Sequence, residues 1–206
     1  MVAKYVVENQ MQIERIVRKI LDSEAEAIKA VSIDESYSVA IEFMSKCEGK
    51  IITTGMGKAG FVAHKFAAIL SSTATPAVFI HPAEAAHGDL GMLAAGDCIV
   101  AFSTSGKTRE VLEFIQLSRR MDIGAIIGIT SHTDSGLREL SDVTINMGVI
   151  QEPCPLGMTP TASMAVMAAI SDALALVLME KKSVSREQYG IRHHGGYLGK
   201  KARIDD

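Results

Sequence analysis

The chain has 206 residues, of which 48% are hydrophobic and 22% are charged. This length suits one domain, or one domain with a small appendage, and the composition is typical of a globular chain with a sizeable core. General disorder and two separate domains are therefore not expected. Lys and Arg number 21 against 24 Asp and Glu, so the net charge is 21 − 24 = −3. This balance gives no electrostatic footprint for a nucleic acid partner.

The three cysteines, Cys47, Cys98 and Cys154, are an odd number without metal-type or redox spacing. We expect no disulfide framework, and a reducing cytoplasm fits best. Four charged residues interrupt the first fifteen positions, so no signal peptide is predicted. The longest apolar stretch, Ala162 to Met179, approaches membrane-span length but contains Asp172. An Asp facing lipid would cost several kcal/mol, so we expect a buried helix and no membrane partner.

The chain begins with helical spacing over residues 6 to 47, which predicts two N-terminal helices. From Lys50 onward, short apolar runs alternate with longer helical patterns, as in βαβ units. The predicted strands are Ile51–Thr54, Ala77–Ile80, Cys98–Phe102, Ala125–Thr130 and Val143–Met147. The predicted helices between and after them are Lys58–Leu70, Thr108–Met121, Asp134–Leu140 and Thr159–Lys182.

These elements predict an α/β fold, a single three-layer domain with a five-stranded parallel sheet flanked by helices in the flavodoxin-like, doubly wound manner. We divide it into N-terminal helices (1–48), the doubly wound core (49–182) and a tail (183–206) rich in Gly, His, Arg and Lys. The tail either frays or folds over something. In such a sheet ligands bind at the carboxyl ends of the strands, which directs attention to the loops after Thr54, Ile80, Phe102 and Met147.

The loop after the first strand, Gly55 to Gly60, matches G-x-G-x-x-G. A dinucleotide site also needs an acidic residue about 20 positions on, and Glu84 lies 29 residues past Gly55. The glycines alone are explained by a tight strand-to-helix turn. Such a turn does not explain Lys58. An ammonium group beside the N–H groups at a helix start favours a bound anion or a developing oxyanion.

The loop after the third strand, Ser103-Thr104-Ser105-Gly106-Lys107-Thr108, ends like a Walker motif, but position 101 is Ala where that motif needs Gly. An NTPase is therefore disfavoured. The hydroxyls and N–H groups of this segment, which leads into a helix, instead suit one phosphate group. Glu110 follows in the first turn of that helix.

Other polar residues fall in three further segments. Residues 81–91 hold two His, a Glu and an Asp, including His87, but a spacing of six between the His residues is not diagnostic of a metal site. Hydrogen-bonding or acid–base histidines are the preferred interpretation. Glu152 lies in the long 148–160 loop, and His193-His194 in the tail. Together with the cradle, these residues suit proton transfer on a small phosphorylated substrate without a cofactor.

The chain resembles the sugar isomerase (SIS) domain family and, within it, the arabinose-5-phosphate isomerases. The motifs that carry the resemblance are residues 55–58, 81–92, 103–106, 152–161 and 193–199. It implies the SIS fold, self-association into dimers or tetramers, and interconversion of D-arabinose 5-phosphate with D-ribulose 5-phosphate through a cis-enediol, with no cofactor and no metal. Members are also known that only bind phosphosugars, and others that isomerise 3-hexulose 6-phosphate or amino-sugar phosphates, so these alternatives stay open.

Carried over by position, the resemblance implies that Ser103, Ser105 and Thr108 hold the substrate phosphate. Lys58, Glu110, Glu152 and His193 then form the catalytic set, with Gly55, Gly57 and His87 close by, in a site assembled across a subunit interface. A carboxylate with a modestly raised pKa suits the base; we assign Glu152 to this role and Glu110 as its partner. Lys58 is assigned to the enediolate oxygens and His193 to ring opening.

The sequence departs from the family pattern at two positions, with Lys107 in place of the usual acid and His194 in place of the usual proline. Many members also continue into cystathionine-β-synthase-type regulatory domains. The 206 residues hold none, so we expect a short form without nucleotide regulation through such domains. The sensor half of a transcription regulator would need a DNA-binding module. The first 50 residues carry 7 Lys and Arg against 9 Asp and Glu, so they show no basic recognition helix of the kind such a module uses.

Overall fold

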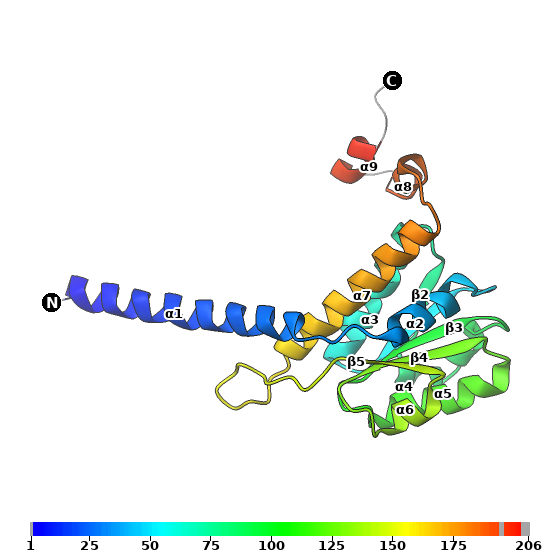
Figure 1. Ribbon diagram of the computed structural model, residues 1–206, viewed down its shortest axis with the longest axis horizontal. Helices are drawn as coiled ribbons and strands as arrows, with labels where there is room; N and C mark the ends of the chain where they lie inside the picture. The colour runs from blue at the N-terminus through cyan, green and yellow to red at the C-terminus, as the bar shows by residue number, and fades with distance from the viewer. Residues whose placement is uncertain (1, 194–195, 203–206) are drawn as a thin grey trace.

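The central element of the computed structural model, which describes residues 2–193 and 196–202, is a five-stranded parallel sheet (Figure 1). Its strand order is β2-β1-β3-β4-β5, the order of a flavodoxin-like doubly wound fold. The strands are β1 (Ile51–Gly55), β2 (Ala77–Phe79), β3 (Cys98–Phe102), β4 (Ala125–Thr130) and β5 (Val143–Asn146). The predicted fold and all five strands are confirmed, with boundaries that differ by one residue at most.

The sheet is the core of the molecule because both of its faces are covered. Every residue of β1, β3 and β4 is buried, which explains why these segments are continuous apolar runs rather than alternating ones. The edge strands β2 and β5 are only partly buried.

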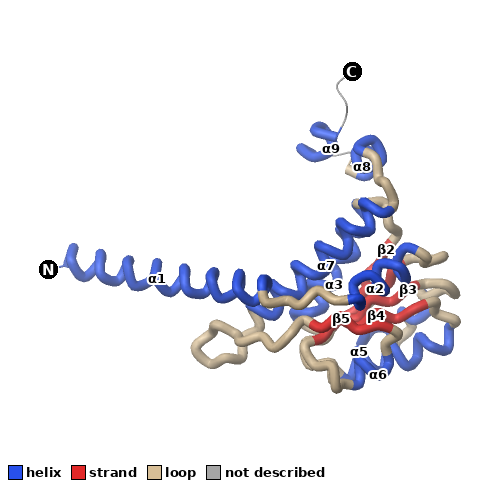
Figure 2. Tube along the Cα trace, viewed as in Figure 1, coloured by secondary structure: helices blue, strands red, loops and turns tan. Residues whose placement is uncertain are grey.

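Helices cover the sheet in two layers (Figure 2). One face packs against α2 (Glu35–Ser45), α3 (Lys58–Ser72) and α7 (Ala162–Lys181). The other packs against the helices α4 (Pro82–Ala85), α5 (Arg109–Ser118) and α6 (Gly136–Leu140). Short 3₁₀ helices at Asp89–Met92 and Arg119–Met121 complete the connections. The short helices at residues 82–85 and 89–92 were not predicted, because four-residue elements carry no periodic signal.

The N-terminal helix α1 (Val2–Lys29) contacts α7 and then extends beyond the rest of the chain as a long arm (Figure 1). Five of its large apolar side chains are about half exposed: Met11, Ile13, Ile16, Val17 and Leu21. The helical periodicity that predicted α1 is therefore correct, but most of this apolar face does not contact the core of its own chain.

Helix α7 is the long apolar segment that the sequence predicts to be a buried helix. By length and composition alone it could cross a membrane, but half of its most apolar window is buried against the fold. Its buried side includes Val166, Ile170 and Leu174. Asp172 accepts a hydrogen bond from the ammonium of Lys65 on α3, at 2.6 Å, so the charged residue has a protein partner.

The tail forms two short helices, α8 (Arg186–Arg192) and α9 (Gly196–Ala202). They pack on each other, with Arg186 donating a hydrogen bond to the carbonyl of Lys201 at 3.0 Å. Figure 1 places both beyond the C-terminal end of α7, away from the sheet. The described part of the tail is thus helical, and its two helices lie away from the sheet of their own chain (Figure 1).

A buried carboxylate joins the beginnings of β1 and β3. Asp97, which is 0% exposed, accepts hydrogen bonds from the N–H groups of Lys50 and Ala94 and from the ammonium of Lys50, each at 2.8 Å. Because one side chain satisfies three donors on two segments, it fixes how these strands start relative to each other.

Removing this carboxylate should be costly. We expect Asp97→Ala to lower the free energy of unfolding by about 3 kcal/mol, because it leaves buried donors and a partly buried ammonium without a partner. The matched control is Asp172→Ala, which breaks a half-exposed ion pair and should cost less than about 1 kcal/mol. Urea unfolding measures both, and equal losses would contradict this account.

Candidate active site

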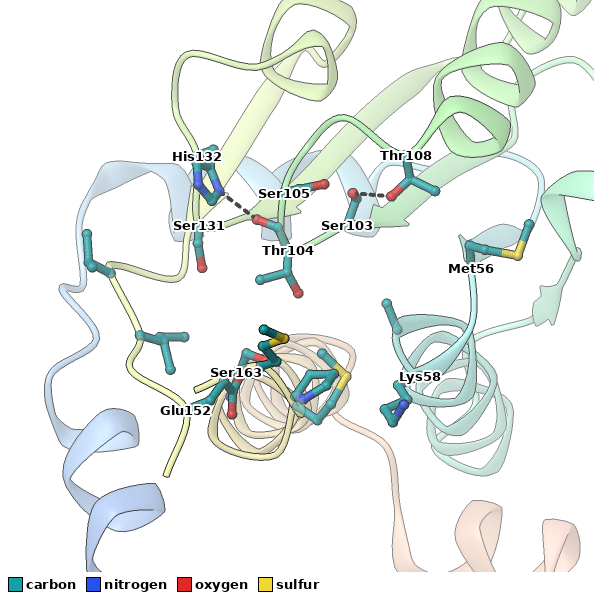
Figure 3. A pocket seen from close by; sticks show the side chains of 16 residues that line it. Met56, Lys58, Ser103, Thr104, Ser105, Thr108, Ser131, His132, Glu152 and Ser163 are labelled. Atoms are coloured by element: carbon teal, nitrogen blue, oxygen red, sulfur yellow. Dashed lines mark hydrogen bonds between the residues drawn. The ribbon is translucent and has the colours of Figure 1, made fainter. Parts of the chain in front are cut away.

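A cavity of about 590 Å³ opens at the carboxyl ends of β1, β3 and β4, beside the N-terminal end of α7 (Figure 3). The strand order reverses between β1 and β3, so the cavity lies at the switch point where ligands bind in this class of sheet. It is lined by Met56, Lys58, Ala59, Ser103, Thr104, Ser105, Thr108, Ser131, His132, Val149, Ile150, Glu152, Met158, Pro160, Ser163 and Met164.

The predicted phosphate cradle forms one wall of the cavity. Thr108 is the N-cap residue of α5, but its side chain caps no N–H group. Its hydroxyl instead shares a hydrogen bond of 2.8 Å with the Ser103 hydroxyl, and Ser105 accepts one from the N–H of Lys107 at 3.2 Å. The first N–H groups of α5 thus remain free of a side-chain cap, as an anion site at a helix start requires.

Gly106 allows the cradle to close against the loop after β4. Its φ is +63°, and a Cβ atom at this position would lie 2.1 Å from the hydroxyl oxygen of Ser135. The Gly106 carbonyl also accepts a hydrogen bond from the N–H of Leu137 at 2.9 Å. Gly106 therefore shapes the cradle without lining the cavity, and no other residue fits here.

Lys58 contributes an ammonium group from the first residue of α3, opposite Glu152 in Figure 3. The first turn of α3 packs closely on the end of β1, since a Cβ on Gly60 would lie 2.6 Å from the carbonyl oxygen of Gly55. Gly57 precedes the helix with φ +59°. Gly55 and Gly57 do not line the cavity themselves, so their role is the tight turn that presents Lys58.

Glu152 lies at the N-terminal end of α7. Its carboxylate accepts hydrogen bonds from the N–H groups of Thr161, Ala162 and Ser163 at 2.8, 2.9 and 3.2 Å. Partial burial raises the pKa of Glu152, but contacts with Ser163 and these N–H groups outweigh it and hold the pKa below its usual range. The Ser163 hydroxyl approaches the carboxylate without making a hydrogen bond of good geometry. The expectation of a raised pKa is therefore wrong, because helix capping favours the ionised form.

Besides the three glycines, three further residues of the predicted site do not line the cavity of this chain. Glu110 is half-buried in the first turn of α5, and His87 is exposed between α4 and the next 3₁₀ helix. His193 follows α8, where its ring stacks on Tyr189 at 3.9 Å and Nδ1 contacts the Tyr189 carbonyl at 3.0 Å. The 20 residues of α7, about 30 Å of helix, separate the tail from the cavity.

The described tail residues, 183–193 and 196–202, therefore do not line the cavity of their own chain, because they follow the far end of α7. His194 lies outside the described residues. Lys107 is exposed and does not line the cavity.

The loop after β4 also contributes to the cavity, although the sequence pattern did not indicate it. Ser131 and His132 both line the cavity, and they follow directly after Thr130, the last residue of β4. The rule that ligands bind at strand carboxyl ends applies to this loop as it does to the others. Ser163 was missed because only its position in the first turn of α7 brings it to the cavity.

Two further features concern metals and thiols. Within residues 2–193 and 196–202, no three His, Cys, Asp or Glu side chains gather as a metal site would require. Cys154 accepts hydrogen bonds from the N–H groups of Thr159 and Met158, both at 3.2 Å, and these lower its thiol pKa to about 7. Burial instead raises the pKa of Cys47 and of Cys98.

The fold and the cavity define a class of protein. It is a doubly wound α/β domain whose switch point holds a predicted phosphate cradle, a lysine and a carboxylate. The SIS domain family matches residues 44–177, more than half of the chain. Arabinose 5-phosphate isomerase KdsD of Yersinia pestis is 38% identical over 193 residues, which cover 92% of this chain and 58% of that protein. The chain thus spans about 58% of the length of that relative. The chain belongs to the SIS domain family.

Solved structures agree with this assignment. The Escherichia coli CFT073 protein c3406, in complex with arabinose 5-phosphate, superposes with a TM-score of 0.86 at 33% identity, covering 89% of this chain and 98% of that one. A Bacteroides fragilis protein, described as a candidate phosphosugar isomerase involved in capsule formation, has a TM-score of 0.86 at 41% identity, with 90% and 99% covered.

The capping role of Glu152 predicts a pH-dependent loss of stability in Glu152→Gln. At pH 7 we expect a free energy of unfolding about 1 kcal/mol lower, since a charged cap is replaced by a neutral one. A depressed folded-state pKa stabilises the fold above the unfolded-state value of about 4.5. That contribution disappears as the pH falls through the lower folded-state value. Urea unfolding from pH 7 to pH 3 should show the two proteins converging, and a constant difference would contradict the capping.

The thiol environments predict selective alkylation. Iodoacetamide at pH 7 should modify Cys154 well before Cys47 or Cys98, because the thiolate is the nucleophile. The labelling rate of Cys154 should rise with pH through an inflection near 7. Mass spectrometry of peptides reads all three sites, and Cys154→Ser is the control. An inflection at an ordinary thiol pKa would show that the two N–H contacts do not persist in solution.

Proposed function

We propose that this protein is a cofactor-independent aldose–ketose isomerase of phosphosugars, and that it interconverts D-arabinose 5-phosphate and D-ribulose 5-phosphate. The observation that carries the proposal is the convergence of the Ser103–Thr108 cradle, Lys58 and Glu152 on one cavity. The relatives named arabinose 5-phosphate isomerase, and the E. coli structure with bound arabinose 5-phosphate, support this substrate.

The cradle is proposed to bind the substrate phosphate. Its hydroxyls and the N–H groups at the start of α5 supply neutral donors and the positive end of a helix dipole. Because the phosphate does not react, its binding energy aligns the sugar so that C1 and C2 lie near Glu152.

The proton transfers are assigned to Glu152, which lines the cavity away from the cradle (Figure 3). Starting from open-chain arabinose 5-phosphate, the Glu152 carboxylate removes the C2 proton. The electron pair forms the C1–C2 double bond, and the former carbonyl oxygen on C1 takes a proton, which gives the cis-enediol. Return of a proton to C1 and loss of the O2 proton complete ribulose 5-phosphate. Lys58 stabilises negative charge on the enediolate oxygens. At neutral pH Glu152 is ionised, as a base must be, and the lowered pKa makes it a weaker base than an ordinary Glu, so the reaction relies on Lys58 to stabilise the enediolate.

Glu110 and His193 are proposed to complete the catalytic set from a second subunit or after closure, with His193 acting in ring opening and His87 near the substrate. Two observations support self-association into dimers or tetramers. The apolar face of α1 is half exposed in the single chain, and His193 is at the opposite end of α7 from the cavity. We propose a cytoplasmic location, which suits the three free cysteines.

The experiment incubates the protein in D₂O with a panel of five- and six-carbon sugar phosphates and follows C2 proton exchange by NMR. We expect exchange with arabinose 5-phosphate and none with phosphate-free arabinose. If only 3-hexulose 6-phosphate or an amino-sugar phosphate showed exchange, that compound would be the substrate instead of arabinose 5-phosphate. Binding without exchange would show that the protein is a phosphosugar-binding protein.

The base assignment has its own variants. Glu152→Gln should lower turnover by about 10² to 10⁴, the usual cost of losing a general base. The control variant is Glu113→Gln. Glu113 lies on the exposed side of α5 and does not line the cavity, so this variant should keep the parent rate. Circular dichroism confirms that each variant is folded, and near-normal turnover by Glu152→Gln would disprove its role.

A further inference from the structure

Two serine hydroxyls that line the cavity make no hydrogen bond of good geometry with the described residues, although one of them approaches the Glu152 carboxylate. They belong to Ser131, directly after β4, and to Ser163, in the first turn of α7. Both oxygens are shielded from solvent, and Ser163 is only 2% exposed. A shielded hydroxyl without a partner costs free energy, so each such group in a native protein calls for a partner that a ligand can supply.

Ser131 is fixed relative to the phosphate cradle. The carbonyl of Thr104 accepts hydrogen bonds from the N–H of Ser131 at 3.0 Å, the hydroxyl of Thr130 at 3.1 Å and Nδ1 of His132 at 3.0 Å. Three donors on one carbonyl hold the loop after β4 against the loop after β3. The backbone of Ser131 is therefore fixed beside the cradle, at the end of the cavity where the phosphate is proposed to bind.

Ser163 is fixed relative to the carboxylate instead. Its N–H donates to Glu152 at 3.2 Å, so its hydroxyl stays beside the group assigned as the base. Figure 3 shows Ser131 on the cradle side of the open centre and Ser163 on the Glu152 side. One unpaired hydroxyl is thus tied to the phosphate end of the cavity and the other to the reacting end.

The chemistry of this pair suits the neutral middle of a sugar. An anion would be repelled by the ionised Glu152 next to Ser163, and an apolar group would leave both hydroxyls unpaired. A sugar hydroxyl can both donate to and accept from a serine. If the phosphate lies in the cradle and C1 and C2 lie near Glu152, the other two hydroxyls lie between these ends. The C4 hydroxyl is then nearer the phosphate, and the C3 hydroxyl is nearer the reacting carbons.

We propose that Ser131 is a specificity-determining residue that hydrogen-bonds the C4 hydroxyl of the open-chain sugar phosphate, with Ser163 facing the C3 hydroxyl. This inference rests on the proposed function for the orientation of the substrate. It assigns selection of the sugar's carbon skeleton to a wall formed by the loop after β4, separate from the cradle and from the groups that move protons.

The test measures kcat/KM, and by calorimetry Kd, for ribulose 5-phosphate and its 4-deoxy analogue. Ser131→Ala should lower kcat/KM and affinity for ribulose 5-phosphate by about three- to tenfold, the usual effect of one neutral hydrogen bond. With the 4-deoxy analogue, Ser131→Ala and the parent protein should agree within twofold. Ser163→Ala should show the same pattern with the 3-deoxy analogue.

The control is Thr133→Ala, which removes an exposed hydroxyl from the same loop without touching the cavity and should behave as the parent with every ligand. The melting temperature of Ser131→Ala should not fall, because no protein hydrogen bond is lost from that hydroxyl. A fall in melting temperature with equal losses for both ligands would show a structural role and overturn the inference.

The outcomes separate this inference from the proposed function. Ligand-selective loss in Kd without any turnover would retain the Ser131 contact and disprove the isomerase. Turnover by the parent with no ligand-selective loss in Ser131→Ala would overturn the contact and leave the isomerase standing. Failure of the parent to bind ribulose 5-phosphate at all would overturn both.

Discussion

Gly55 pairs with Phe102, and Phe102 with Ile129, so that β1, β3 and β4 end at one level of the sheet. This register is the constraint on which the site depends. It places the helix start that carries Lys58 beside the Ser103–Thr108 cradle, and the cradle beside Ser131. A slip of one residue in any of these buried strands would reverse its faces, which the covering helices on both sides do not permit.

Two of these loops, the cradle and the loop after β4, are also bonded to each other. The Thr104 carbonyl joins the cradle to the loop after β4, and Gly106 lets the two loops approach closely because it has no side chain. Separately, Glu152 joins the 148–160 loop to α7. These parts of the cavity wall are thus held by hydrogen bonds within the protein that exist before a ligand arrives. Such preorganisation is what electrostatic and positional catalysis require.

How far the sequence predicts this arrangement depends on how local each feature is. The strands were predictable because fully buried strands are short continuous apolar runs, and the cradle because hydroxyls precede a helix. The capping of α7 by Glu152 was not, since it joins residues nine or more positions apart through a loop without periodicity. The remoteness of His193 follows from the direction of α7, and the unpaired Ser131 hydroxyl from tertiary packing. Neither leaves a pattern in the sequence.

The central claim is that the phosphate of the sugar lies in the cradle while its reacting carbons face Glu152. The most direct measurement is a crystal structure of the protein with bound ribulose 5-phosphate. The account predicts phosphate oxygens within hydrogen-bond distance of Ser103, Ser105 and Thr108, with C1 and C2 toward Glu152. A phosphate bound elsewhere, or a reversed sugar with its phosphate against Glu152, would contradict it.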